Sequence, residues 1–178
     1  MKHLWGVVVA GLMLAACGDG KKEAAERLAQ EADSLAQLST AIDLEPHGFP
    51  LELQAPDAQT LMGAEPAVVF NENTGKLEIR AGDRFALTVV EEPGDMARLK
   101  ADLDREQVRR NTVTSETPEL LIYQSEFPDD PSLVFLHFYR IVQAGGRTFV
   151  VEDLQEGKPF NAQDIERMTP AVRAKQPV

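Results

Sequence analysis

Hydrophobic residues recur at every second position over much of the chain, which is the period of a strand with one buried face. Residues 49–55 are the first case, and Pro50 places that strand at a sheet edge or at its own beginning. A short apolar run at 67–70 and alternating segments at 77–81 and 85–90 follow. We therefore predict four strands in this part of the chain.

The connections between these strands are short and rich in turn-forming residues. Residues 71–75 are Asn-Glu-Asn-Thr-Gly, a composition that accepts positive φ angles. Gly82 and Asp83 form the next tight connection. Because tight turns join antiparallel neighbours, the pattern predicts that these strands form an antiparallel meander.

More strands are expected in the second half of the chain. Two of them flank a turn at Thr117-Pro118. Residues 133–142 are apolar on both faces, which predicts a central strand covered on each side. Gly145-Gly146 then predicts a hairpin to a strand at 149–151.

A helix is predicted between the two groups of strands. Asp95 can accept hydrogen bonds from the free amides of a first helical turn, so it is the expected N-cap. The apolar side of this helix is formed by Met96, Leu99, Leu103 and Val108. We expect that side to lie on a face of the sheet.

A second helix closes the chain. Asn161 is its predicted N-cap, with Asp164 in the capping-box position. Ile165 and Met168 supply its buried side, and Pro170 ends it or starts a fresh turn. The order of strands, helix, strands and closing helix predicts an α+β fold, with helices packed on an antiparallel sheet.

A further helix is predicted near the N-terminus, over residues 21–38. This segment consists almost entirely of strong helix formers and carries a thin apolar stripe. It lacks the sustained heptads of a coiled coil, so a solvated spacer or a helix packed on the domain is the better interpretation.

The first 16 residues have the organisation of an export signal: a basic start, a short apolar run and small residues. Leu14-Ala15-Ala16-Cys17 resembles the lipobox of bacterial lipoproteins. That resemblance implies that Cys17 becomes the mature N-terminus and carries a diacylglyceryl group and an N-acyl chain. Two or three acyl chains would anchor the protein stably in a membrane.

Cys17 is the only cysteine of the chain, so lipid attachment also accounts for an otherwise unpaired thiol in an oxidising compartment. In lipoproteins an aspartate directly after the cysteine retains the protein at the inner membrane, whereas this chain has Gly18 there. The resemblance therefore favours the outer membrane of the bacterial envelope.

The expected organisation is a signal peptide at 1–16, a lipidated tether and helix at 17–41, and a single α+β domain at 42–178. The chain carries a formal net charge of −11, and an acidic surface repels nucleic acid and anionic lipid. We therefore expect a membrane partner only through the lipid, and no nucleic-acid partner.

Residues 42–175 also resemble Mog1/PsbP-like domains, which close with two long antiparallel strands and a capped helix. Uncharacterised bacterial envelope lipoproteins have the same order of elements. The resemblance rests on three segments: Phe135-Leu136-His137-Phe138-Tyr139-Arg140, Arg147-Thr148-Phe149-Val150-Val151-Glu152, and Phe160 through Met168. It implies a fold and transfers no catalytic residue.

Few residues are candidates for chemistry. His137 lies in the predicted central strand, where an imidazole is usually a hydrogen-bonded core group, and His47 is expected to be solvated in a loop. Glu91-Glu92 with Asp95, and Asp129-Asp130, are weak candidates for binding a cation, because Ca²⁺ prefers carboxylate oxygens. Neither pair has the spacing of an EF-hand. We predict no metal and no cofactor apart from the lipid on Cys17.

These observations favour a non-enzymatic, lipid-anchored envelope protein that binds a partner protein or a small ligand. The apolar side of the N-terminal helix, or a sheet face bearing Tyr123, Phe127 or Phe160, is the candidate groove. One alternative is a lipid or small-ligand carrier, which requires an apolar cavity. Another is an envelope hydrolase, which requires polar groups that converge around His137 or the acidic loops.

Overall fold

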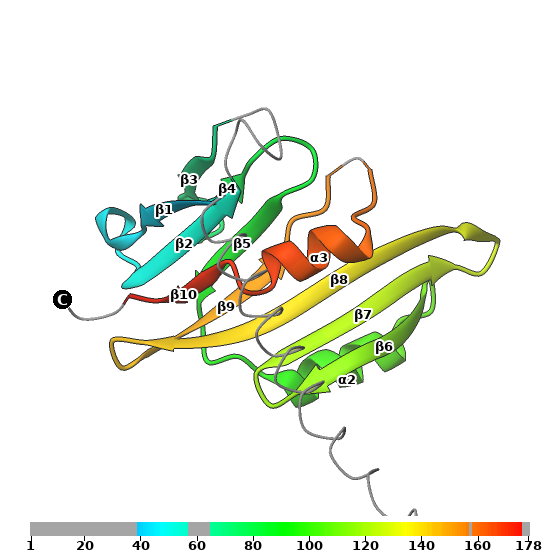
Figure 1. Cartoon of the computed structure of the whole chain (residues 1–178). Coiled ribbons are helices and arrows are strands. Elements are labelled where there is room, and N and C mark those ends of the chain that lie inside the picture. Colours follow the sequence, from blue (N-terminus) through cyan, green and yellow to red (C-terminus); the bar gives the residue numbers. More distant parts are fainter. Residues whose placement is uncertain (1–38, 57–64, 157, 176–178) are drawn as a thin grey trace, which may run out of the picture. The chain divides into compact units, whose positions relative to one another are not determined.

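A computed structural model describes residues 39–56, 65–156 and 158–175, all within one compact unit. Figure 1 shows the elements in chain order: β1 (Ser39–Asp43), the 3-10 helix η1 (Glu45–His47), β2 (Leu51–Pro56), β3 (Ala67–Asn71), β4 (Lys76–Arg80), β5 (Ala86–Glu91), α2 (Met96–Arg105), β6 (Arg110–Thr117), β7 (Leu120–Phe127), β8 (Asp130–Ala144), β9 (Arg147–Asp153), α3 (Ala162–Met168) and β10 (Val172–Ala174). The lipobox with Cys17 and the helix predicted at 21–38 lie outside the described residues.

The strands form two sheets in which every pair of neighbours is antiparallel. The large sheet has seven strands in the order β3-β4-β5-β9-β8-β7-β6, and the small sheet has the order β1-β2-β10. The predicted meander is confirmed for β3-β4-β5, whereas β2 lies in the small sheet, where it pairs with β1 and β10. With two α-helices added, the predicted α+β class is confirmed as well.

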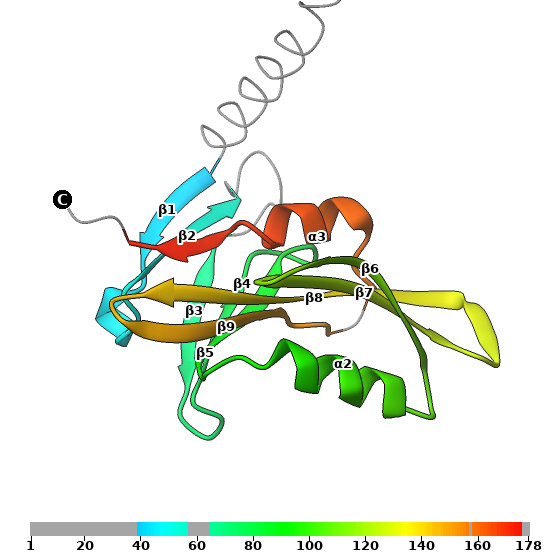
Figure 2. The ribbon, with the colours of Figure 1, turned by 90° about the horizontal axis from the view of Figure 1, so that it is seen from below.

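The two faces of the large sheet are covered by different elements. Figure 2 shows the small sheet and α3 on one side of it and α2 on the other. The predicted central strand is β8, which lies between β9 and β7. It contributes Phe138 to one core and Tyr139 to the other, so it is covered on both faces as expected.

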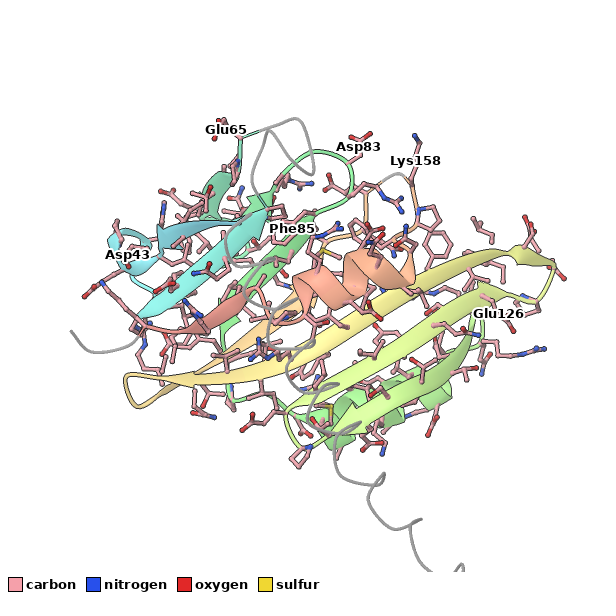
Figure 3. The ribbon with its side chains drawn as sticks, viewed as in Figure 1. Asp43, Glu65, Asp83, Phe85, Glu126 and Lys158 are labelled. Carbon is pink, nitrogen blue, oxygen red and sulfur yellow. The ribbon has the colours of Figure 1, made fainter. Side chains whose placement is uncertain are left out.

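The main core lies between the two sheets. The alternation in β2 buries Leu51 and Leu53 fully against the large sheet, because one side chain in two faces inward. Phe149 of β9 packs against Phe49, with ring centroids 5.6 Å apart. Figure 3 shows Phe85 inside this layer, next to β5. Burial of this apolar surface is the main force that joins the two sheets.

A smaller core lies under α2. Met96, Leu99 and Leu103 pack against Tyr139 and Leu121 of the sheet. The helix begins where predicted, since the Asp95 carboxylate accepts a hydrogen bond from the Arg98 amide at 2.8 Å. It ends at Arg105, however, so Val108 lies outside it and is 67% exposed. The prediction that Val108 joins the apolar side of this helix was wrong.

The local signals for the closing hairpin and the last helix are confirmed. Gly145 and Gly146, at φ 58° and 73°, make the turn between β8 and β9. Asn161 and Asp164 form the reciprocal capping box of α3, with hydrogen bonds of 3.0 and 2.8 Å.

Three features of the small sheet differ from the prediction. The folded part begins earlier than Ile42, because β1 starts at Ser39. The chain after Pro170 turns into a strand, β10, which pairs with β2. As a result β2 lies in the centre of its sheet rather than at an edge. The other interpretation of Pro50, that the strand begins there, is confirmed, because β2 starts at Leu51. Neither β1 nor β10 shows a long hydrophobic period, so both depend on pairing with β2.

No helix in the described part of the chain is long and apolar enough to cross a membrane.

Candidate functional site

His137 and Asp153 form a largely buried polar pair between β8 and β9. Nδ1 of His137 lies 2.9 Å from Oδ2 of Asp153, while Oδ1 accepts a hydrogen bond from the Phe138 amide at 2.8 Å. The two side chains are 13% and 4% exposed. Asp153 therefore holds both the imidazole and the backbone of β8.

The position of Asp153 depends on where β9 separates from β8. The register between these strands ends at the pair Tyr139 and Glu152. One further pair would place Asp153 opposite Phe138, with its side chain on the other face from His137. Because the pairing has ended, the carboxylate takes the place of a backbone acceptor and also reaches the imidazole.

Tyr123 of β7 covers the other side of the imidazole. Its ring stacks on His137 with centroids 4.9 Å apart and an interplanar angle of 26°. The two residues are a direct cross-strand pair, which explains the contact. Burial raises the pKa of the Tyr123 hydroxyl, and the nearby charge of Asp153 acts in the same direction. Tyr123 therefore stays neutral at physiological pH.

The remaining nitrogen of His137 is not available at the surface. Nε2 is buried and has no hydrogen-bond partner among the described residues. A general base must come within hydrogen-bond distance of its substrate, or reach it through one water molecule. In this conformation the pair therefore acts as a clamp between β8 and β9. The prediction that His137 is a hydrogen-bonded core group is confirmed for its Nδ1 atom.

A second polar network lies near this pair, at the end of α2. The Asn111 amide donates hydrogen bonds to Leu103 O at 3.0 Å and to Glu106 at 3.2 Å. It accepts one from Ser125, which is 1% exposed, at 2.6 Å. Arg109 binds Glu106 through two nitrogens and holds the pKa of that carboxyl below its usual value. The network fastens α2 to β6 and β7.

The acidic candidates serve other roles. Glu91 forms an ion pair with Arg147, whose Nη1 also donates to Gly48 O at 2.8 Å, and that arginine holds the pKa of Glu91 below its usual value. Glu92 is exposed beside this pair, and Asp95 caps α2. Glu91 therefore connects the end of β5 to the hairpin before β9.

The second acidic pair, Asp129 and Asp130, lies at the turn that leads into β8. The Asp130 carboxylate accepts hydrogen bonds from the Ser132 hydroxyl at 2.6 Å and from the Ser132 amide at 3.3 Å. Asp129 is exposed before it. No group of three or more potential metal ligands occurs within residues 39–56, 65–156 and 158–175.

Two hollows open on the surface, and charged residues line both. One, of about 350 Å³, includes Arg80, Asp83, Glu156 and Lys158, and Figure 3 shows Asp83 and Lys158 on the neighbouring loops. The other, of about 430 Å³, includes Glu92, Asp95, Arg98 and Asp102. Both are open to solvent and have mixed polar and apolar linings, which differs from the enclosed apolar cavity that a lipid carrier requires.

The aromatic residues predicted as a possible groove do not share a face. Tyr123 lies on the α2 side of the large sheet, whereas Phe160 is 4% exposed in the main core. Phe127 contacts Phe135, with ring centroids 6.2 Å apart. Tyr123 and Phe160 therefore lie on opposite sides of the large sheet, and the N-terminal helix that the predicted groove also involved lies outside the described residues.

The exposed apolar residues are elsewhere. The largest exposures are those of Val108 at 67%, Val69 at 58% and Phe70 at 45%, followed by Val113 and Leu133. Val69 and Phe70 lie on β3, which is a terminal strand of the large sheet. Sequence reasoning predicted the strand but not that it lies at an edge, because the pattern of one strand does not reveal its neighbours.

Comparison with known proteins finds no matching family model, no matching curated protein and no matching solved structure.

Proposed function

We propose that this protein is a lipid-anchored bacterial envelope protein whose α+β domain binds a partner protein without catalysing a reaction. The observation that carries the proposal is the exposure of Val69 and Phe70 on a terminal strand. These consecutive side chains point to opposite faces of the sheet, so what they share is the free edge of β3, where an extended segment of a partner can pair. The candidate catalytic groups support the same proposal, because His137 and Glu91 are held in bonds between strands.

The proposed location rests on the lipobox. Cys17, with Gly18 after it, favours the outer membrane, and the lipid would hold the domain close to that surface. The small-ligand alternative has less support, because the two hollows are open and charged.

We also infer a Mog1/PsbP-like arrangement for the domain. The long β8–β9 hairpin, followed by α3 with its cap at Asn161, supports this. Helices on both faces of an antiparallel sheet support it too. The fold by itself suggests binding and assembly and implies no reaction.

The anchor is tested by the intact mass of the membrane-extracted protein and by the variant Cys17→Ala. We expect the mass of a chain that begins at Cys17 with its acyl groups, and we expect C17A to leave the membrane fraction. An unmodified Cys17, or cleavage at another position, would remove the basis for the location.

The binding function is tested with the full lipidated chain in intact cells. A photo-crosslinking amino acid is placed at Val69, and the matched control position is Glu116 on β6, at the opposite end of the sheet. We expect one envelope protein to be captured from position 69 and not from position 116. The crosslinking amino acid is also placed at the exposed residues Val108 and Val113. If no position yields a specific crosslinked product, the proposal of a binding module is contradicted.

A further inference from the structure

The two ends of the large sheet differ in how their backbone is protected. A terminal strand has amides and carbonyls that face away from its only neighbour, and it can therefore pair with another strand. β6 and β3 are these terminal strands. Natural proteins protect such edges with charges, bulges and short strands.

The β6 edge is protected in two of these ways. Its register with β7 shifts between Val113 and Ser115, which is a bulge, and the Thr114 hydroxyl donates to Ile122 O at 3.1 Å. Glu116 near its end forms an ion pair with Lys100 at 2.8 Å. A bulged and charged strand is a poor template for pairing.

The β3 edge is short, at five residues, but it has neither a bulge nor a charge. Its register with β4 is continuous from Ala67 to Asn71, and the strand contains no charged residue. Val69 is exposed on it, and Phe70 lies 6.4 Å from the Phe49 ring at the margin of the main core. An added strand would therefore gain backbone hydrogen bonds and would extend an existing apolar layer.

The charges at the ends of β3 indicate the chemistry of the added strand. Glu65 precedes the strand and Glu72 follows it, both are exposed, and neither forms an ion pair with another described residue. Figure 3 shows Glu65 directed away from the domain next to β3. A strand with an apolar centre and basic residues at both ends would complement these two carboxylates.

A second copy of this chain is a poorer occupant. Antiparallel self-pairing centred on Val68 or Val69 would bring Glu65 of one copy within one residue of the position opposite Glu72 of the other, at both ends of the contact. Like charges this close across a strand pair destabilise it. The net charge of −11 on each copy adds to this repulsion.

We propose that β3 recruits an extended segment of a partner protein, with an apolar centre and basic flanks, as an added strand of the large sheet. This inference rests on the proposed binding function and specifies its surface and the chemistry of its partner.

The test uses the lipidated full chain in nanodiscs and a soluble probe peptide with alternating valine and threonine between paired lysines. We expect the peptide to bind and to slow hydrogen exchange of the β3 amides. The same peptide with flanking glutamates, or with alternate amides N-methylated, should bind at least about tenfold more weakly. Added salt should weaken the lysine peptide, because exposed charges are screened.

Variants of β3 provide the matched controls. Val69→Lys places a charge on the edge and should weaken the peptide at least about tenfold, whereas Val69→Thr should keep most of the binding. The double variant Glu65→Lys/Glu72→Lys should prefer the glutamate-flanked peptide. Position 69 is exposed, so we expect unchanged unfolding midpoints for both single variants, and urea titration checks this.

Four outcomes would overturn the proposal. They are equal binding of all three peptides, protection in the monomer of the β3 amides that face away from β4, a peptide-free dimer that V69K abolishes, and binding of the C17A protein to phosphatidylcholine vesicles that V69K abolishes. If a V69K chain that carries the photo-crosslinking amino acid at Phe70 captures the same envelope partner as the chain with the crosslinker at position 69, the binding function holds and this inference fails. If the wild-type chain captures none, the binding function itself fails.

Discussion

Several side chains of this domain take over hydrogen bonds that the backbone of a sheet would otherwise make. Asp153 accepts from the Phe138 amide where β9 leaves β8, and the Gln155 amide donates to Leu136 O at 3.0 Å two residues later. Arg140 donates to two carbonyls of the segment between α3 and β10, Thr169 O and Val172 O, both at 2.8 Å. Such residues are stabilising because an unpaired buried backbone group is costly.

The Asp153 carboxylate should therefore contribute more to the stability of the fold than its charge alone would suggest. Asp153→Ala leaves the Phe138 amide and the His137 Nδ1 without their acceptor, so we expect a loss of about 2–4 kcal/mol in the free energy of unfolding. Urea unfolding measures this. The control Asp129→Ala, in an exposed turn, should change stability by less than about 0.5 kcal/mol. Equal effects of the two variants would contradict the clamp.

Glu152 gives the domain a pH dependence of the opposite sign to that of an ion-paired surface carboxylate. Partial burial raises the pKa of Glu152 above its ordinary value of 4.5, and the charges of Glu92 and Asp153 add to the shift, although Lys76 lies 3.7 Å away. The folded state therefore binds a proton at Glu152 more tightly than the unfolded chain does. Stability from this group is lost as the pH rises from about 4.5 through the raised pKa.

Glu152→Gln should remove this loss. Between about pH 4 and about pH 7, the free energy of unfolding of the variant should fall less than that of the wild type. At neutral pH the variant should be the more stable of the two. Urea titrations across this range measure both effects. Glu72→Gln, in an exposed turn, is the control and should leave the pH profile unchanged. A wild-type-like profile for E152Q would show that burial of Glu152 is not responsible.

At the scale of elements, turns and caps decide where strands and helices begin. Gly94 stands between β5 and α2 with φ 67°, and a Cβ there would lie 2.9 Å from the side chain of Ile141. Gly75, in the turn between β3 and β4, has φ 68° and open space around it. Glycine is therefore favoured at position 75 by its backbone conformation alone. At position 94 it is favoured both by its backbone conformation and by the close approach of Ile141.

This pair of glycines separates backbone strain from packing. Gly75→Ala should cost about 1–2 kcal/mol, because an L-residue is strained at positive φ. Gly94→Ala should cost about 1–3 kcal/mol more, because Ile141 and the start of α2 must also move. Chemical denaturation of both variants measures the difference. Equal losses would show that Ile141 yields without cost.

At the scale of the whole domain, two cores of unequal size share one sheet. The core between the sheets contains many fully buried side chains, whereas that under α2 has only Leu121, Tyr139 and Val150 buried, and α2 itself has no buried residue. Most of the stability should therefore come from the side of α3 and the small sheet, and α2 should be the more easily detached helix.

Matched truncations in the two helices test this asymmetry. Met168→Ala in α3 removes a fully buried side chain and should cost about 2–5 kcal/mol. Leu99→Ala in α2 removes a half-buried one and should cost about 1–2 kcal/mol. Urea unfolding compares the two, and hydrogen exchange should show faster opening of α2. A larger loss for L99A would reverse the assignment of the main core.

The sequence by itself determined the meander, the hairpin at Gly145-Gly146 and the caps at Asp95 and Asn161, because each depends on residues within a few positions of one another. The end of α2 before Val108 could not be read in this way, because apolar spacing continues past the last helical turn. The lipobox is equally local, and the membrane anchor stays a prediction.

The tertiary structure decided which strands become neighbours and which of their residues meet. Asp153 reaches His137 only because β9 leaves β8, and the regular register would have placed the two on opposite faces. β1 and β10 form only through pairing with β2, and β3 lies at an open edge only because no other strand pairs with it within the described residues. The identity of a neighbouring strand is a property of the assembled sheet, so the candidate interaction surface appears only in three dimensions.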